Sequence, residues 1–246
     1  MKYKLIILLP LFSVNLHAAF SFSDDFESGD TSAWGATIPI AENFVNGCNA
    51  SLSVNASAAS SGNFGLEATI CDTNAGIAVV QDFSPNLEQS YRAIFDFNPT
   101  NAFITDGQEL VIFQARANPA SSIALELRLY RAGMNYEIRA YAFDDSDSAV
   151  GPVSIPLPDL NVHRIGVGFS AASGPGNDDG SLTLELDQVP VAPGDVLTGI
   201  DNDTKLIDSA RLGIINSTGN AGSVYFDKFN SDSAILPVTL MQFEVD

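Results

Sequence analysis

Residues 161–190 read NVHRIGVGFSAASGPGNDDGSLTLELDQVP. Ile165, Val167 and Phe169 alternate with Arg or Gly in the first part of this stretch, and leucines alternate with polar residues in the last part. A period of two predicts two β-strands, each with one apolar face. Residues 170–180 between them hold glycines and an Asn-Asp-Asp run but no apolar period, which is typical of a turn region. The stretch therefore predicts a long hairpin in a half-buried antiparallel sheet.

The same pattern recurs along the chain, and no segment shows a sustained helical period. Residues 123–130 and 136–143 alternate in the same way and predict a second hairpin. In its predicted register Arg128 lies opposite Glu137 and Glu126 lies opposite Arg139. About a dozen strands with frequent turn signals predict an all-β sandwich of two stacked sheets. Residues 144–158 and 191–208 are predicted to be irregular. The predicted strands are residues 49–56, 64–70, 77–83, 91–97, 110–115, 123–130, 136–143, 165–169, 182–186, 211–216 and 223–229.

The first residues have the pattern of a secretory signal peptide. Lys2 and Lys4 precede an apolar run that ends in small residues at Ala18 and Ala19, and this run is shorter than the roughly 20 apolar residues of a membrane-spanning helix. We therefore expect a signal peptide at residues 1–18 and a single domain at residues 19–233. Residues 234–246 form a tail, either an edge strand or a sorting segment. The mature protein is expected to be secreted, outside the cell or in a periplasm.

The chain is strongly acidic. Its formal net charge is −19, and removing the signal peptide leaves 11 − 2 = 9 basic residues against 30 acidic ones, a charge of −21. Such a charge repels phosphate backbones and anionic lipids, so neither nucleic acid nor a membrane is an expected partner.

Two cysteines, Cys48 and Cys71, flank a predicted strand–turn–strand unit. An exported chain with two cysteines favours a disulfide, and antiparallel pairing of these strands would bring the two residues opposite one another. A structural disulfide between them is the prediction.

Several stretches in order resemble one known family. These are DDFESGDTSAW, SGNFGLEATI, FSPNLEQSYRAIFDF, HRIGVGF, GSLTLELDQ and GSVYFDKF. Together they are similar to the laminin G-like branch of the concanavalin A-like lectin and glucanase superfamily. The resemblance implies a jelly roll of two curved antiparallel sheets in which the first strand, residues 22–26, lies beside the last, residues 224–229. It also implies binding of glycans or proteins as the usual function.

The sequence does not complete a catalytic set. Glucanases of this superfamily carry three alternating acids on one strand, because a retaining reaction needs a nucleophile and an acid/base held at a defined spacing. Glu185 and Asp187 supply two of them, but Val189 and Pro190 stand where the third would be. His163, the one histidine of the mature chain, lies at the start of a predicted strand, where a histidine is usually a packed or capping residue, so a Ser/His/Asp set is not expected either. We therefore expect no catalytic residues and no enzyme activity.

A glycan-binding face is the next candidate. If the two predicted hairpins are neighbours in one sheet, their polar faces combine aromatic rings, which stack on sugars, with charged groups, which bind hydroxyls. Gly166 and Gly168 would leave room for a groove. An ordinary exposed face with cross-strand ion pairs explains the same pattern. The predicted ligand-binding residues are Tyr130, Tyr141, Phe143, Glu126, Arg128, Arg139, Glu185 and Asp187.

Calcium is the cofactor that the acidic residues suggest. Ca²⁺ takes six to eight oxygen ligands, and acids near the first strand would meet an acid on the last strand if those strands are adjacent. The predicted ligands are Asp24, Asp25, Glu27 and Asp227, with Asp178–Asp179 and Asp201 with Asp203 as rival loops. Solvated turns explain such clusters equally well.

These observations together predict a secreted, non-catalytic protein that binds glycans or an extracellular protein surface. Two alternatives remain open at this point, a glycan hydrolase of the same superfamily and a structural extracellular component.

Overall fold

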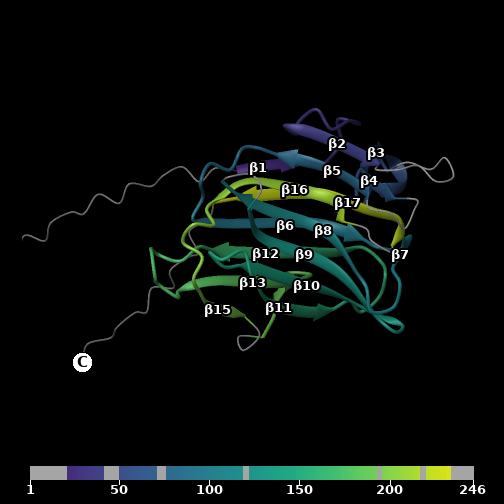
Figure 1. The fold of residues 1–246 in the computed structure, drawn as a ribbon. Coiled ribbons are helices and arrows are strands. Elements are labelled where there is room, and N and C mark those ends of the chain that lie inside the picture. Colours follow the sequence, from purple (N-terminus) through teal and green to yellow (C-terminus); the bar gives the residue numbers. More distant parts are fainter. Residues whose placement is uncertain are drawn as a thin grey trace, which may run out of the picture.

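The structure is a computed structural model that describes residues 21–41, 50–70, 76–118, 122–192, 196–216 and 220–233. Over these residues the chain forms two antiparallel sheets packed face to face (Figure 1). The predicted all-β jelly-roll sandwich is confirmed. No helix of the described part is long and apolar enough to cross a membrane. The predicted signal peptide, the tail at residues 234–246, Cys48 and Cys71 lie outside the described residues, so export and the disulfide stay predictions.

The larger sheet has ten strands and contains the hairpin of residues 161–190. Three strands leave its main path: β1 and β7 pair with β17, and β15 pairs with β13. Its main order is β14 (Val189–Pro190), β13 (Gly180–Leu186), β12 (His163–Ser170), β6 (Ser90–Asn98), β17 (Ala221–Asp232), β4 (Gly65–Ile70) and β3 (Ser51–Asn55), and the additional strands are β1 (Ser21–Asp24), β7 (Ala102–Phe103) and β15 (Leu197–Ile200).

The smaller sheet has seven strands and contains the second predicted hairpin. Its order is β11 (Ala149–Pro156), β10 (Asn135–Phe143), β9 (Ile123–Ala132), β8 (Glu109–Ala117), β16 (Ile207–Asn216), β5 (Gly76–Asp82) and β2 (Ala36–Ala41).

The chain closes on itself as the resemblance implied. β1 pairs antiparallel with β17, with Ser21 opposite Asp232 and Asp24 opposite Phe229. The long hairpin pairs Ile165 with Leu186, which puts the alternating apolar residues of both strands on the same face. The first and the last strand of the described residues are therefore neighbours in the larger sheet.

The core lies between the two sheets and is built from the apolar faces of their strands. Phe95 and Phe229 of the larger sheet meet Phe113 of the smaller sheet at ring-centroid distances of 5.8 and 6.2 Å. All three rings are almost completely buried. Trp34 adds an indole ring whose centroid lies 5.0 Å from that of Phe229. Aromatic contacts between the layers thus hold the sandwich together.

Two segments that were predicted as irregular contain strands. Residues 149–156 form β11, the edge of the smaller sheet, and residues 197–200 form β15. The prediction was wrong because Gly151–Pro152 and a shift of register between Ala140 and Ala142 interrupt the alternation of β11.

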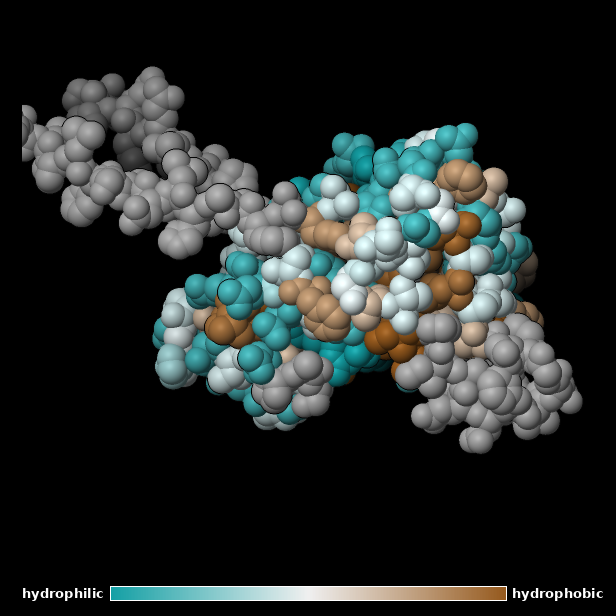
Figure 2. Space-filling model, turned by 90° about the horizontal axis from the view of Figure 1, so that it is seen from above, coloured by the Kyte–Doolittle hydropathy of each residue, from teal (hydrophilic) through white to brown (hydrophobic). Residues whose placement is uncertain are grey.

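Seen from above, the surface is mostly hydrophilic or intermediate, with small separate hydrophobic patches (Figure 2).

Candidate functional site

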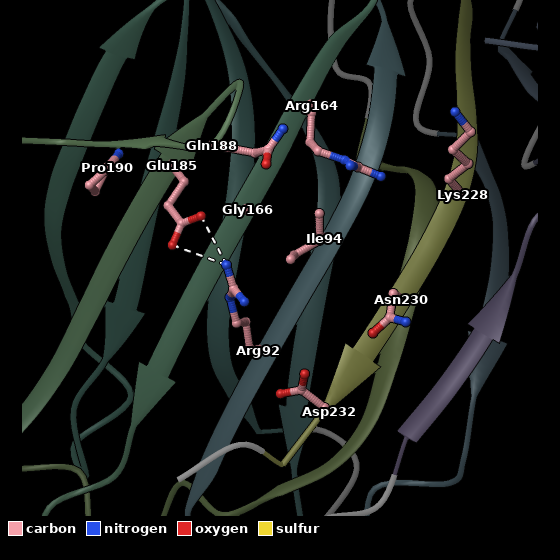
Figure 3. A pocket seen from close by; sticks show the side chains of 10 residues that line it. All are labelled: Arg92, Ile94, Arg164, Gly166, Glu185, Gln188, Pro190, Lys228, Asn230 and Asp232. Atoms are coloured by element: carbon pink, nitrogen blue, oxygen red, sulfur yellow. Dashed lines mark hydrogen bonds and ion pairs between the residues drawn. The ribbon is translucent and has the colours of Figure 1, made fainter. Parts of the chain in front are cut away.

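The outer face of the larger sheet carries a groove of about 630 Å³. Its floor follows one row across neighbouring strands, in which Glu185 pairs with Gly166, Gly166 with Ile94, and Ile94 with Asn230. Gly166 has no side chain, so the floor is low at its middle. Figure 3 shows the lining residues Arg92, Ile94, Arg164, Gly166, Glu185, Gln188, Pro190, Lys228, Asn230 and Asp232.

Two cations of one wall share a single carboxylate. Arg164 Nε lies 3.3 Å and Lys228 Nζ 3.5 Å from the two oxygens of Asp96, which is nearly buried. The Arg164 Nε is itself buried and makes no hydrogen bond, because the geometry at Asp96 is poor despite the short distance. Ser60 holds Asp96 from behind through its hydroxyl, at 2.7 Å. This wall therefore has more positive than negative charge facing the groove.

Lys228 reaches the groove because of a β-bulge. Asp227 pairs with Asp96, but the next pair along β17 and β6 is Asn230 with Ile94, so β17 has one extra residue. Lys228 occupies this position with φ +50°, a left-handed conformation that is uncommon for a residue with a side chain. Such strain and such bulges concentrate at functional sites, where they redirect a side chain.

The opposite wall holds an ion pair that crosses β12. Arg92 Nη2 lies 3.2 and 3.0 Å from the two carboxylate oxygens of Glu185 (Figure 3). The pair passes over glycines, and a Cβ built on Gly166 would lie only 3.2 Å from the Glu185 side chain. The glycines predicted to leave room for a groove thus leave room for this pair.

A second hollow of about 370 Å³ continues the groove toward β1. It shares Arg164, Lys228 and Asn230 with the first hollow and adds Asp24 and Asp25 of the first strand and its turn. Together the two hollows extend from β14 to β1 across the sheet, a shape that suits an extended chain molecule.

The predicted glycan face is divided between the two sheets. Glu185 lines the groove of the larger sheet, whereas Glu126, Arg128 and Tyr130 lie on β9 of the smaller sheet and pair with β10. The premise that the two hairpins are neighbours is wrong, because alternation shows which face of a strand is buried but not which sheet the strand joins. Arg139, Tyr141 and Phe143 lie on β10. The ligand-binding roles of these residues stay a prediction.

The register of the second hairpin also differs from the prediction. Arg128 lies opposite Arg139, and Glu126 lies opposite Tyr141. Like charges are accommodated because each guanidinium stacks on a ring, that of Arg139 at 3.3 Å from the Tyr130 centroid and that of Arg128 at 4.2 Å from the Tyr141 centroid. One face of each of these two tyrosine rings, which were predicted to bind sugars, is thus covered by a guanidinium group.

Glu109 of β8 binds both arginines of this network. Its carboxylate accepts hydrogen bonds from Arg128 at 2.8 Å, Arg139 at 3.0 Å and the Tyr141 hydroxyl at 3.1 Å. Burial acts to raise the pKa of Glu109, but the hydrogen bonds from Arg128 and Arg139 outweigh it and hold the pKa below its ordinary value.

Glu109→Gln is expected to lower the free energy of unfolding by about 1 kcal/mol at neutral pH, since the pairs are partly exposed. A lowered pKa in the folded state contributes stability above the unfolded pKa, and this contribution is lost as the pH falls through the folded value. Urea unfolding of both proteins from pH 7 down to acid checks this, because their stabilities should converge. A difference that stays constant with pH would contradict it.

The four predicted calcium ligands are engaged by different donors. Asp24 accepts from the Trp34 indole nitrogen at 2.7 Å, Glu27 from the Asn63 backbone nitrogen at 2.7 Å, and Asp227 from the Ser60 backbone nitrogen at 2.9 Å. Asp25 accepts from the Glu27 backbone nitrogen at 3.2 Å, as in a turn. Burial raises the pKa of Asp24.

A different set of acids comes together on the described loops. One carboxylate oxygen each from Asp145, Asp201 and Asp203 lie within 4.8 Å of one another. Desolvation, with the neighbouring Asp145, raises the pKa of Asp201 and Asp203. This set includes one of the rival loops. Calcium binding stays a prediction, and a rise in melting temperature with calcium that a chelator reverses would support it.

Asp187 is not a neighbour of Glu185 in the groove. It follows the end of β13 in a turn with φ +52°, where its carboxylate contacts His163 Nδ1 at 2.9 Å and the Arg164 backbone nitrogen at 2.9 Å. His163 Nε2 lies 3.0 Å from Asp159 on its other side. These contacts hold the turn next to Gln188, a lining residue.

Sequence reasoning missed Arg92, Lys228, Asn230 and Asp232 in the groove. Arg92 is visible in the alternation of β6, because its neighbours Tyr91 and Ala93 are buried. Lys228 is not visible, since the bulge breaks the alternation of β17 at that residue.

A scan against protein-family models finds no match, and no characterised protein matches by sequence. Solved structures do match by fold. An endo-β-1,4-glucuronan lyase from the fungus Trichoderma reesei aligns with a TM-score of 0.60 and 14% identity over 87% of this chain and 95% of that one.

Two further solved structures align over similar lengths. A cellulose-induced protein gives a TM-score of 0.58 and 15% identity over 87% of this chain and 97% of its own. An alginate lyase aligns with a TM-score of 0.56 and 10% identity over 86% of this chain and 96% of its own. At these identities the likeness is one of fold, a jelly-roll β-sandwich of two antiparallel sheets.

These findings correct the prediction of a non-catalytic binding protein. The structures that share the fold over nearly their whole length include a glucuronan lyase and an alginate lyase, so an enzyme that acts on glycans, the class of the hydrolase alternative, is favoured over the binder. The missing third carboxylate excluded only one catalytic arrangement, because a lyase does not need the carboxylate pair of a glucanase.

Proposed function

We propose that the protein is a lyase that cleaves acidic, uronate-containing polysaccharides by β-elimination. The observation that carries the proposal is the groove on the larger sheet, which combines an open, extended shape with Arg92, Arg164 and Lys228 on its walls. The groove also contains the acids Glu185 and Asp232, but in a chain of net charge −19 a groove with three cations is a favourable place for an anionic ligand. Neighbours of the same fold are a glucuronan lyase and an alginate lyase, the latter also solved with an alginate tetrasaccharide.

β-Elimination needs two kinds of group. A cation must bind the uronate carboxylate, because removal of the adjacent C5 proton puts negative charge onto that carboxylate. A second group must accept the C5 proton and a proton must reach the glycosidic oxygen as its bond to C4 breaks and the C4–C5 double bond forms.

Arg164 is assigned the first role. Its guanidinium carries a permanent charge and lines both hollows, and its Nε makes no hydrogen bond in the described structure. An incoming carboxylate would give it the planar, two-point partner that Asp96 does not.

Lys228 is assigned the proton transfer. A lysine that has first released its own proton to solvent can accept the C5 proton as a neutral amine and then give it to the glycosidic oxygen, which a guanidinium cannot do in this range of pH. Lys228 Nζ lies beside Arg164 through their common contact with Asp96, so a sugar whose carboxylate is on Arg164 would bring its C5 proton near Lys228.

Export from the cell would bring the protein to its proposed substrate. A secreted protein, as the predicted signal peptide indicates, would meet polysaccharides outside the cell. We also propose that the chain belongs to the laminin G-like branch of the concanavalin A-like superfamily and that its ligand is a glycan.

Incubation of the purified domain with polyglucuronate and with alginate tests the reaction. We expect ultraviolet absorbance from the unsaturated uronate at the new chain end, and none with a neutral β-glucan as the control. New reducing ends without this absorbance would assign hydrolysis instead. No cleavage of any acidic polysaccharide would count against the proposal.

A further inference from the structure

The Arg92–Glu185 ion pair stands between two hollows of the larger sheet. Both residues line the groove of about 630 Å³, and both also line a small cavity of about 40 Å³ on the other side of the pair. In Figure 3 the two side chains point toward each other across β12. The pair therefore closes the groove at this position.

The small cavity is lined by groups that suit a sugar. Ser181 and Thr183 supply hydroxyls, Tyr91 and Phe169 supply further wall, and Gly168 forms the floor. A Cβ on Gly168 would lie 2.6 Å from Thr183 Oγ1, so a side chain at this position would displace the Thr183 side chain. With a volume of about 40 Å³ this cavity has room for water but is far smaller than the groove of about 630 Å³ beside it. A sugar ring fits there only if the ion pair opens.

The ion pair is of a kind that opens easily. The side chains of Arg92 and Glu185 are 38% and 27% exposed, and a single nitrogen makes both contacts. An exposed ion pair of this kind changes the equilibrium constant between its closed and open states by about five-fold or less. A uronate carboxylate has the same chemistry as Glu185 and can bind a guanidinium through two parallel hydrogen bonds. It can therefore compete with Glu185 for Arg92, whereas a neutral sugar cannot.

We propose that Glu185 occupies the place of a substrate carboxylate and that the Arg92–Glu185 pair is a gate to an additional subsite over Gly168. A uronate that takes Arg92 from Glu185 opens the gate and places its ring between Ser181 and Thr183. The gate selects for an acidic sugar at this position. This inference rests on the proposed function, because it assumes that the groove takes an acidic polysaccharide.

Glu185→Gln tests the gate, because it keeps the side chain's shape but removes the charge that holds Arg92. Calorimetric titration with uronate oligosaccharides of defined length should show binding that is about two- to five-fold tighter than for the unsubstituted protein. With cleavage as the readout, KM should fall by a similar factor while kcat stays unchanged. Oligosaccharides whose carboxylates have been reduced to alcohols should bind both proteins equally.

A second pair of variants separates the gate from a general loss of negative charge. Asp232→Asn removes a charge from the same groove, opposite Arg92 across β17 and β6, and leaves Glu185 in place. In an Arg92→Gln background, Glu185→Gln should then improve binding no more than Asp232→Asn does, because no guanidinium is left to release.

The outcomes distinguish the gate from the proposed function. Equal binding by the Glu185→Gln variant and the unsubstituted protein overturns the gate and leaves the lyase proposal standing. A ten-fold or larger loss of kcat in Glu185→Gln also overturns it, since Glu185 would then take part in the chemistry. Failure of the unsubstituted protein to bind any uronate oligosaccharide overturns the proposed function itself.

Discussion

Lys228→Arg is expected to abolish β-elimination while the protein stays folded and still binds acidic polysaccharide. The substitution keeps the positive charge beside Asp96 but replaces an amine, which can exchange a proton, by a guanidinium, which cannot. General acid–base catalysis contributes about 10²- to 10⁴-fold to a rate, so kcat should fall by about that factor. Steady-state cleavage of polyglucuronate or alginate, followed by absorbance of the unsaturated product, measures it.

Lys228→Met is the matched comparison. It removes both the charge and the proton transfer, so it should lose kcat like Lys228→Arg and should also bind more weakly. The arginine and the methionine that replace Lys228 must each adopt the same left-handed backbone conformation as the lysine, so the two substitutions should affect folding similarly. If Lys228→Arg keeps most of its kcat, then Lys228 acts through its charge alone and the proton acceptor lies elsewhere.

Phe229→Ala is expected to cause the largest loss of stability. Phe229 is 1% exposed and lies among Trp34, Phe95 and Phe113, so the substitution leaves a cavity where both sheets meet. Such a change costs about 3–5 kcal/mol, a large part of the 5–15 kcal/mol that stabilises a typical domain.

Urea unfolding followed by circular dichroism measures this effect. Trp34, the chain's only tryptophan, gives an independent fluorescence signal from the same cluster. Phe103→Ala is the control, because this ring is 61% exposed and its removal should change stability by no more than about 0.5 kcal/mol. Similar losses from both substitutions would show that the aromatic cluster does not hold the sheets together.

Alternation was enough to predict most of the fold. Strands such as β12 and β13 bury every second residue without interruption, so their existence, pairing and buried faces follow from the residue pattern. β11 breaks this pattern at Gly151–Pro152 and was missed.

The site was harder to predict because its parts depend on long-range geometry. Charge matching within the second hairpin gave the wrong register, since Glu109 on a third strand neutralises Arg128 and Arg139 together. Glu185 was identified, but its partner Arg92 comes from a strand 93 residues away in the chain. Lys228 depends on a bulge that no periodicity reveals.

The position of β17 has a consequence for how the protein is made. This last described strand pairs with β1, β4, β6 and β7, so until residue 232 has been synthesised the strands from β14 to β6 are not joined to β4 and β3, and β1 and β7 have no partner in the larger sheet. Contacts between such distant residues must wait for both ends of the chain, which slows folding. The growing chain cannot assemble its groove on the ribosome in stages. The groove is complete only when β17 has joined β6, because Lys228, Asn230 and Asp232 of β17 line it.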